Sequence, residues 1–419
     1  MKAKRYWIGA VLACLFHGAA SGQLTLEECQ RAARENYPLV KQYELIGKTR
    51  DFTLENASKG YLPQISVSGK VSYQSDVTKM PIAIQGLEFG LDKDQYQTVV
   101  ELNQAIWDGG TARQRREEAK VAADVREGQV EVNLYALRER VNQIYFAVLL
   151  IDAQLEQNAL LQAQLERNYR QVEACVGQGV ATPPDLDAVS VEQLNARQTA
   201  AELRMNRRAY LEVLGMLTGK GDLAHEVLAR PSVDMPASAE LLRPELSLYD
   251  SRRKQLEVQE RGLDTGVMPR LSLFAQGAYG DPGLNMLEGG FKPYYIAGLR
   301  LSWNIGGFYT RKNDKRLLDV SRSDIDVQEE AFRLENRMEA AQYRRAVERL
   351  DTLMKNDDEL LRLRGNIRRA AEAKVEGGTL TVTEMLREVL AEDQARQTKV
   401  VHDIQRLQAL CNIKYVLNH

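Results

Sequence analysis

The chain carries the same sequence pattern twice at a fixed spacing, and this duplication constrains its fold more than any other feature. YLPQISVSG starts at Tyr61, and VMPRLSLFA starts at Val267. Each follows an earlier proline, Pro38 or Pro244, and the interval between the two prolines is the same in both halves. The chain is therefore expected to repeat one order of elements: a helix, a pair of strands, a long helix, a glycine turn and a returning helix.

The duplication predicts one body made of two repeats, preceded by a leader. Residues 1–22 combine a basic start, a short apolar run and small residues before Gln23, which is the pattern of a signal peptide. A lipoprotein signal with Cys14 as the acylated residue is the alternative. With either leader the chain leaves the cytoplasm. The first repeat is expected to span 23–230 and the second 231–419.

Four segments change to a period of two, which predicts strands with one apolar and one polar face. Ile65, Val67 and Val71, for example, alternate with polar residues. The expected strands are about 64–75, 97–107, 270–280 and 294–305. Strands of roughly ten residues with aromatic side chains near their ends are typical of membrane barrels. Two hairpins leave open edges and are too few to close a barrel, so the chain is expected to oligomerise.

The remaining segments have helical patterns. The expected helices are 23–60, about 110–175, about 183–217, about 309–376 and about 381–417. At ~1.5 Å per residue the two long helices would each be on the order of 100 Å long. Apolar residues from Leu134 to Leu155 step by three and four, which predicts a coiled-coil seam. A plain antiparallel helix pair would account for the same residues.

Charge and motif content exclude several classes of function. The net charge is −2, from 56 basic and 58 acidic residues, so no nucleic-acid partner is expected. The sequence lacks a nucleophile elbow, a P-loop and metal-ligand spacings, and His225, His402 and His419 have no evident partners. We therefore expect no enzyme, no cofactor and no metal. After the leader no segment has the ~20 apolar residues of a membrane helix.

Three cysteines follow the leader, and an odd number cannot form a complete disulfide framework. Cys29 and Cys411 lie near opposite ends of the mature chain, so a disulfide between them is one interpretation. The favoured interpretation is that Cys29, Cys175 and Cys411 are small buried apolar side chains.

Several motifs in this order resemble the TolC-type outer membrane efflux family. They are LTLEECQRAARENYP at Leu24, YLPQISVSG at Tyr61, AIWDGG at Ala105 and LSWNIGG at Leu301. The resemblance covers 23–419, and the wording of the motifs is similar to a Bacteroidetes-like branch. It implies a mainly α fold with a β-barrel part, in which three copies form a twelve-stranded outer-membrane barrel. The barrel would join a periplasmic α-helical barrel of coiled-coil type.

The resemblance also implies a function. The chain would be the passive exit duct of a tripartite efflux or type I secretion-like system, located in the outer membrane and extending into the periplasm. The chain would form a homotrimer in contact with outer membrane lipid. Its protein partners would be a periplasmic adaptor protein and an inner-membrane transporter. A soluble periplasmic coiled-coil scaffold is the alternative. It would explain the heptads but not the alternating strands.

Two groups of site residues follow from the resemblance. The glycine turns at the helix tips match the adaptor-docking turns of the family, and they comprise Val176, Gly177, Gln178, Gly179, Val375, Glu376, Gly377 and Gly378. A periplasmic constriction would use Asp185, Glu384 and Arg387. Glu384 matches an acidic position of the family, whereas Arg387 departs from its acidic pattern. For Asp185 the alternative role is a carboxylate that faces the N-terminus of its helix.

Overall fold

The structure is a computed structural model that describes residues 23–77, 92–236, 238, 240–286 and 288–418. The expected leader, with Cys14, lies outside the described residues. The chain divides into two compact units, each of which draws on both repeats. The sheet unit contains Pro38–Ala136, Pro236–Gln342 and the residues from Lys414. The tip unit contains the segment ending at Tyr37, Leu137–Met235 and Tyr343–Ile413.

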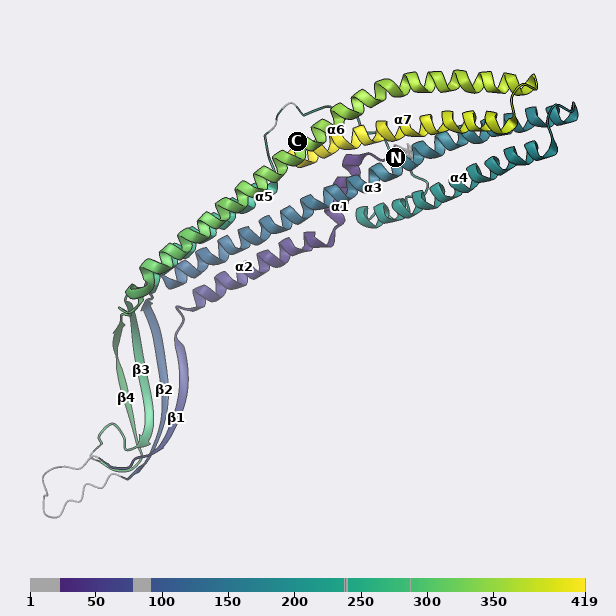
Figure 1. The fold of residues 1–419 in the computed structure, drawn as a ribbon. Helices are drawn as coiled ribbons and strands as arrows, with labels where there is room; N and C mark the ends of the chain where they lie inside the picture. The colour runs from purple at the N-terminus through teal and green to yellow at the C-terminus, as the bar shows by residue number, and fades with distance from the viewer. Residues whose placement is uncertain (1–22, 78–91, 237, 239, 287, 419) are drawn as a thin grey trace, which may run out of the picture. The chain divides into compact units, whose positions relative to one another are not determined.

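The sheet unit is built on an antiparallel sheet whose strands lie in sequence order (Figure 1). The strands are β1 (Gln64–Tyr73), β2 (Asp94–Trp107), β3 (Arg270–Asp281) and β4 (Lys292–Ser302). A bulge between Ala105 and Trp107 interrupts the register of β2 with β3. Among the described residues β1 and β4 each pair on one side only, so the sheet has two open edges.

The register of the strands places most of their apolar residues on the same face of the sheet. Val67 lies opposite Val100, which lies opposite Gly277, which in turn lies opposite Tyr295. The same face also carries Ile65, Val71, Leu102, Leu273, Tyr279, Leu299 and Leu301. The other face is mostly polar, although it also carries Val99, Phe274 and Ile296. There the Gln276 amide donates a hydrogen bond of 3.1 Å to Glu101. On the apolar face Val71 is 76% exposed and Tyr295 is 83% exposed, so this face requires an apolar environment outside the chain.

The helix that leads into the first strand differs from the sequence expectation. A single helix over 23–60 was expected, but the structure has α1 (Leu26–Asn36), the short 3-10 helix η1 (Pro38–Val40) and α2 (Lys41–Lys59). Proline has no backbone N–H and disfavours helical geometry in the residue before it. Tyr37 is accordingly extended, with φ −68° and ψ 133°. The boundary between the two compact units falls at this break.

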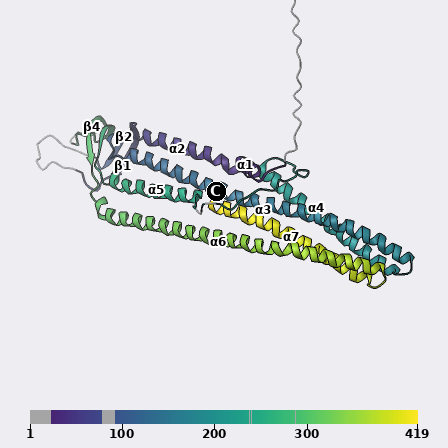
Figure 2. The same cartoon turned by 90° about the horizontal axis from the view of Figure 1, so that it is seen from above.

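Each hairpin continues into a long helix, and each long helix passes from the sheet unit into the tip unit. These helices are α3 (Thr111–Gly177) and α6 (Gly307–Glu376). In the second repeat α5 (Pro244–Gly266) leads into β3, with its proline in the first turn as expected for a helix start. In the tip unit α4 (Pro183–Thr218) lies beside α3, and α7 (Val382–Leu417) lies beside α6 (Figures 1 and 2).

The tip unit has two apolar cores. The first joins α1, α3, α4 and α7, and it contains most of the predicted heptad seam, including Val141, Ile144 and Val148. By length and composition α3 qualifies as a membrane span, which was not expected from the sequence. Its apolar residues in this core pack against Leu211 and Ile404, so helix packing accounts for them. The second core lies under the helix tips.

The three cysteines described are buried thiols. Cys29 and Cys411 lie in the first core, where both pack among apolar side chains. Burial raises the pKa of the Cys29 thiol to about 11, so it stays protonated at neutral pH. The favoured interpretation of these residues as small apolar side chains is confirmed.

Candidate tip and constriction site

The first tip turn is a glycine-capped helix end. The Val180 N–H donates to the Cys175 carbonyl at 2.9 Å, and the Gly179 N–H donates to the Val176 carbonyl at 3.0 Å. This pair of hydrogen bonds defines a Schellman motif, in which the residue after the helix adopts a left-handed conformation. Gly179 has φ 75°, which a residue without a Cβ adopts at little cost.

The second tip turn repeats this motif. The Thr379 N–H donates to the Lys374 carbonyl at 2.9 Å, and the Gly378 N–H donates to the Val375 carbonyl at 3.0 Å. Gly378 has φ 64°. The two turns adjoin, because a Cβ added at Gly378 would lie 3.3 Å from Cγ1 of Val180. The turns of the two repeats thus form one continuous surface.

The predicted tip residues divide into core and surface. Val375 is only 2% exposed, and the half-buried Val176 packs against the same core. The exposed members are Gly177, Gln178, Gly179, Glu376, Gly377 and Gly378. The Gln171 amide donates to the Glu376 carboxylate at 3.0 Å. The surface of the tip is therefore mostly backbone, with two polar side chains.

The predicted constriction carboxylates both cap helices. The backbone N–H and the hydroxyl of Thr182 donate to Asp185 at 2.8 and 2.7 Å. The backbone N–H and the hydroxyl of Thr381 donate to Glu384 at 3.2 and 2.8 Å. Each pair forms a capping box at the first turn of the returning helix. The alternative role of Asp185 is therefore present, and Glu384 has the same role in the second repeat.

Glu384 is an exposed anion. The hydrogen bonds from Thr381 and the charge of Arg387 lower the pKa of the Glu384 carboxyl, so it is ionised at neutral pH. The Arg387 side chain is 74% exposed, and its Nε lies 3.5 Å from Glu388. An acidic and a basic side chain therefore stand one turn apart at the start of α7.

A buried polar layer lies beneath the tip, and the sequence analysis did not anticipate it. Arg368 of α6 forms ion pairs with Glu372, at 2.6 Å, and with Glu392 of α7. From α3 the Gln164 amide donates to Glu372 at 2.6 Å. The Glu392 side chain is only 5% exposed, so these charges depend on one another. The spacings of Arg368 to Glu372 and of Glu392 to Arg396 were the available sequence signals.

Asp393 lies next to this layer with incomplete hydrogen bonding. Its Oδ1 atom is buried and, among the described residues, accepts no hydrogen bond. Burial raises the pKa of the Asp393 carboxyl from 3.8 to about 6, against the opposing effect of Arg396. This group therefore changes charge closer to neutral pH than an ordinary aspartate does.

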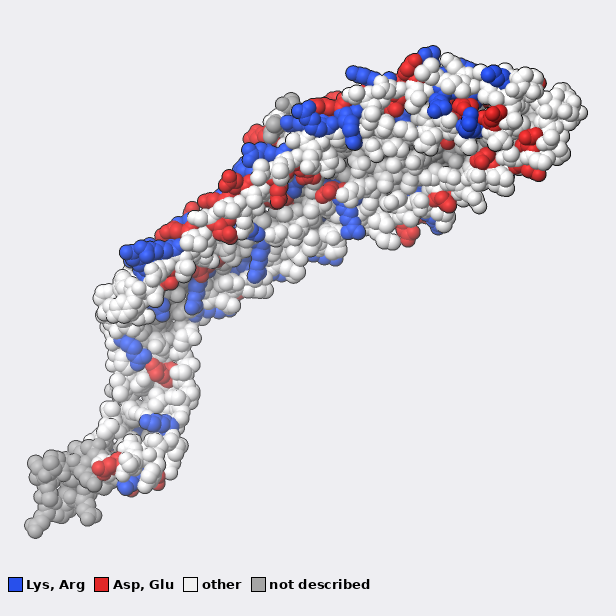
Figure 3. Space-filling model, in the orientation of Figure 1, with Lys and Arg blue, Asp and Glu red and all other residues white. Residues whose placement is uncertain are grey.

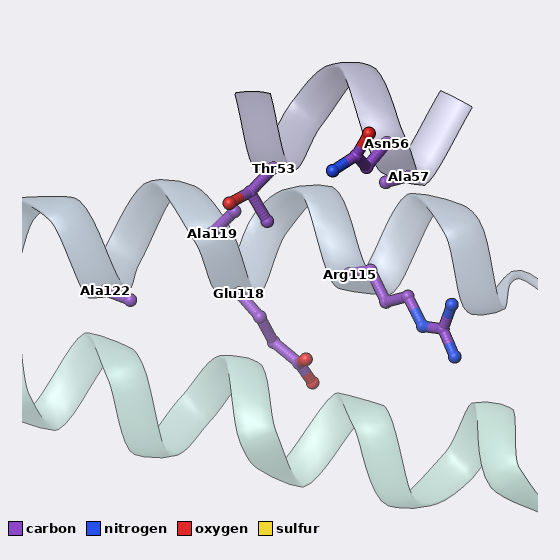
Figure 4. A pocket seen from close by; sticks show the side chains of 7 residues that line it. All are labelled: Thr53, Asn56, Ala57, Arg115, Glu118, Ala119 and Ala122. Atoms are coloured by element: carbon purple, nitrogen blue, oxygen red, sulfur yellow. The ribbon is translucent and has the colours of Figure 1, made fainter. Parts of the chain in front are cut away.

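A cavity of about 450 Å³ opens in the sheet unit between α2 and α3. It is lined by Thr53, Asn56, Ala57, Arg115, Glu118, Ala119 and Ala122. Figure 4 shows that Arg115 and Glu118 extend from the side of α3 that faces away from α2. The lining brings together no pair of acid and base suited to catalysis. In the described ranges no cluster of three or more potential metal-ligating side chains occurs.

Comparisons with known proteins give one family match and several structures of similar fold. A family model described as outer membrane efflux protein matches residues 31–220. A membrane protein from Pseudomonas aeruginosa has a similar structure, with TM-score 0.69 and 16% identity over 94% of this chain and 90% of that chain. Over residues 31–220 the chain is similar to outer membrane efflux proteins, and the solved structure shows the same fold over most of its length. The description of the matched family, outer membrane efflux protein, places its members in the outer membrane.

Two further solved structures share the fold of this chain. The CmeC outer membrane channel of Campylobacter jejuni has TM-score 0.63 and 14% identity, over 94% of this chain and 85% of that chain. The outer membrane protein VceC of Vibrio cholerae has TM-score 0.66 and 12% identity, over 94% of this chain and 95% of that chain. Identities this low show the fold alone. No curated protein matches the sequence.

Proposed function

We propose that this chain is the passive exit duct of a tripartite efflux or type I secretion-like system. Substrates would be delivered by an inner-membrane transporter through a periplasmic adaptor, the arrangement in which members of the family act. The sheet carries the proposal. Its register separates an exposed apolar face from a polar face, as a barrel wall between lipid and an aqueous lumen requires.

The duct is proposed to be a homotrimer with twelve strands. A sheet with open edges at β1 and β4 has an unmet requirement for strand partners, and three copies placed edge to edge would close it. The helices next to these edges support this arrangement. On α6 the exposed apolar residues Val320, Val327 and Leu334 recur every seven residues, and on α2 Leu45 and Phe52 do the same. Such stripes suit packing against a neighbouring copy.

The repeats 23–230 and 231–419 are proposed as equivalent building blocks of the duct. Each would supply two strands to the barrel, and a long and a returning helix to the periplasmic tube. We also propose that the exposed tip residues, from Gly177 to Gly179 and from Glu376 to Gly378, receive the adaptor. Two adjoining glycine turns present backbone groups that a partner can approach closely, which supports this role.

The constriction is proposed to be of mixed charge. Asp185 and Glu384 occupy equivalent first-turn positions beside the tip, and Arg387 adds a cation one turn beyond Glu384. Such a ring would favour cations less than an all-acidic ring does. Replacing Arg387 by Gln should therefore raise the preference for cations, and replacing both carboxylates by amides should lower it.

Single-channel recording in planar bilayers tests this function. The purified full-length protein should produce discrete conductance steps, and Arg387→Gln should shift the reversal potential in a salt gradient towards that of cations. Glu202→Gln, an exposed change on α4, is the matched control and should leave the reversal potential unchanged. Absence of conductance in a protein that inserts as a trimer would overturn the duct. A reversal potential unaffected by Arg387→Gln would overturn only the constriction.

A further inference from the structure

A basic surface surrounds the points where the chain leaves the two hairpins. We call it the basic collar, and it consists of Arg113, Arg115, Arg116, Lys312 and Arg316. All five side chains are exposed, and none forms an ion pair in the part of the chain that the structure describes. Their neighbours Arg311 and Lys315 differ, because Asp264 of α5 lies 2.5 and 3.4 Å from them. The collar therefore has positive charge that no ion pair among the described residues neutralises, although Arg113 lies near enough to Glu117 to help lower the pKa of that carboxyl.

The collar recurs in both repeats. Arg115 and Lys312 occupy equivalent positions, each five residues after the second glycine of its exit, Gly110 or Gly307. Neither α3 nor α6 has an acidic residue in its first turn. Basic residues near a helix N-terminus oppose the helix dipole, which favours acidic residues there. Their presence in both repeats indicates a requirement from outside the helix.

Exposed aromatic side chains lie between the apolar strands and the collar. In the sequence Trp107 precedes the collar part on α3, and Trp303, Phe308 and Tyr309 precede the part on α6. They are 45%, 56%, 43% and 84% exposed, respectively. Figure 3 shows basic side chains gathered on the helices where they join the sheet, next to a sheet surface on which charged side chains are fewer than on the helices. This order of apolar, aromatic and basic surface matches the layers of a membrane interface.

We propose that the basic collar binds the headgroups of anionic phospholipids at the surface where the strands leave the bilayer. Arginine and lysine donate charge-assisted hydrogen bonds to phosphate oxygens, and basic clusters next to membrane segments attract anionic lipid. The inference rests on the proposed function, because the headgroups lie beside the collar only when the sheet is inserted. The aromatic layer favours lipid over an acidic surface on a neighbouring copy, which would need no such layer.

The lipid bound by the full-length protein tests the collar. The protein is placed in nanodiscs made of equal parts of phosphatidylglycerol and phosphatidylethanolamine, and the lipids retained after mild extraction are counted by native mass spectrometry. The test variant combines Arg115→Gln, Lys312→Gln and Arg316→Gln. The matched control combines Arg204→Gln, Arg349→Gln and Lys355→Gln, which removes the same charge from other exposed helix positions with no ion pair among the described residues.

We expect the wild-type protein and the control to retain phosphatidylglycerol in preference to phosphatidylethanolamine. Removing one basic residue from an anionic surface should weaken lipid binding about fivefold. The test variant lacks three such residues, so its preference for phosphatidylglycerol should fall by at least about fivefold. Inorganic phosphate at millimolar concentration should not compete, since the collar requires a membrane surface. Equal retention of the two lipids by the wild-type protein, or an unchanged preference in the test variant, would overturn the proposal. Conductance in planar bilayers is measured separately, so failure of the duct remains distinguishable from failure of the collar.

Discussion

The two helical hairpins of the tip unit share a backbone plan and an apolar core under the tips, but they differ in the number of ion pairs that join their helices. The α3–α4 hairpin packs through apolar side chains such as Tyr145, Val148 and Leu211, and among the described residues Asp152 and Arg207 form the one ion pair between its helices. The α6–α7 hairpin is joined by a series of ion pairs. These are Arg364–Glu388, Arg368–Glu392, Lys399–Asp358 and Arg406–Asp351. His402, for which the sequence showed no evident partner, shares a hydrogen bond of 2.7 Å with Asp357.

The difference shows that the same order of helices and turns can be stabilised mainly by apolar packing in one repeat and with many more ion pairs in the other. Apolar burial is insensitive to salt and depends on close packing. Exposed ion pairs contribute little and weaken with salt, whereas breaking a buried pair is costly. The α6–α7 contact should therefore respond more strongly to pH and ionic strength than the α3–α4 contact does.

The largest effect on stability is expected at the buried ion pairs of the α6–α7 hairpin. Arg368→Ala would leave Glu372 and Glu392 without their main cation, at a cost of about 3–5 kcal/mol in the free energy of unfolding. Denaturant unfolding of the detergent-solubilised protein would measure the cost. The double variant Arg368→Met with Glu392→Met is the control and should recover much of the loss. A cost below about 1 kcal/mol for Arg368→Ala would show that the pair is solvated.

The apolar hairpin should be sensitive to cavities. Leu165 of α3 is fully buried in the core under the tip. Leu165→Ala should lower the free energy of unfolding by about 2–5 kcal/mol, through lost burial and the cavity that remains. Leu360→Ala on α6 is the matched control, because that side chain is 44% exposed, and its effect should stay within about 0.5 kcal/mol. Equal losses in the two variants would contradict the burial of Leu165 in the core under the tip.

Asp393 gives the ionic hairpin a pH dependence. Its pKa is 3.8 ordinarily and about 6 in the folded chain, so between these values the unfolded chain releases a proton that the folded chain keeps. Its contribution to stability therefore falls as pH rises from about 4 to 6 and then levels off. Thermal unfolding at pH 4.5 and 7 should show that Asp393→Asn stabilises the protein more at pH 7. An equal effect at both pH values would contradict the raised pKa.

The smallest effect is expected for an exposed pair. The Lys399 and Asp358 side chains are 39% and 70% exposed and lie 2.5 Å apart. Lys399→Ala should cost about 0.2–1 kcal/mol at low salt and less at 1 M salt. The difference between the two salt concentrations is the quantity to measure by denaturant unfolding. A cost that does not depend on salt would indicate that Lys399 acts through packing of its aliphatic stem.

Periodicity and duplication predicted much of the fold. The strands at 64–73 and 270–281 and the helices α3 and α6 lie within a few residues of the positions expected from the sequence. The break at Pro38 was missed because the residues on both sides favour helix and only the proline opposes it. Sequence also could not reveal that the compact units combine both repeats, since contacts between distant segments leave no local pattern.

The candidate site was predicted only in part. Gly179 and Gly378 are local signals of helix ends. The structure places each of them in the turn between a long helix and its returning helix. The division of the tip into buried Val375 and exposed glycines depends on which helix faces meet. The layer around Arg368 depends on helices brought together from different repeats. The roles of the tips and of the constriction residues remain predictions.

The mass of the protein extracted from outer membranes tests the central claim most directly. Light scattering with the detergent contribution subtracted would give it. The account predicts a particle of three chains, each of 47.3 kDa before removal of the leader. A monomer that stays soluble without detergent would contradict it, because an exposed apolar sheet face with open edges would then need neither lipid nor partner strands.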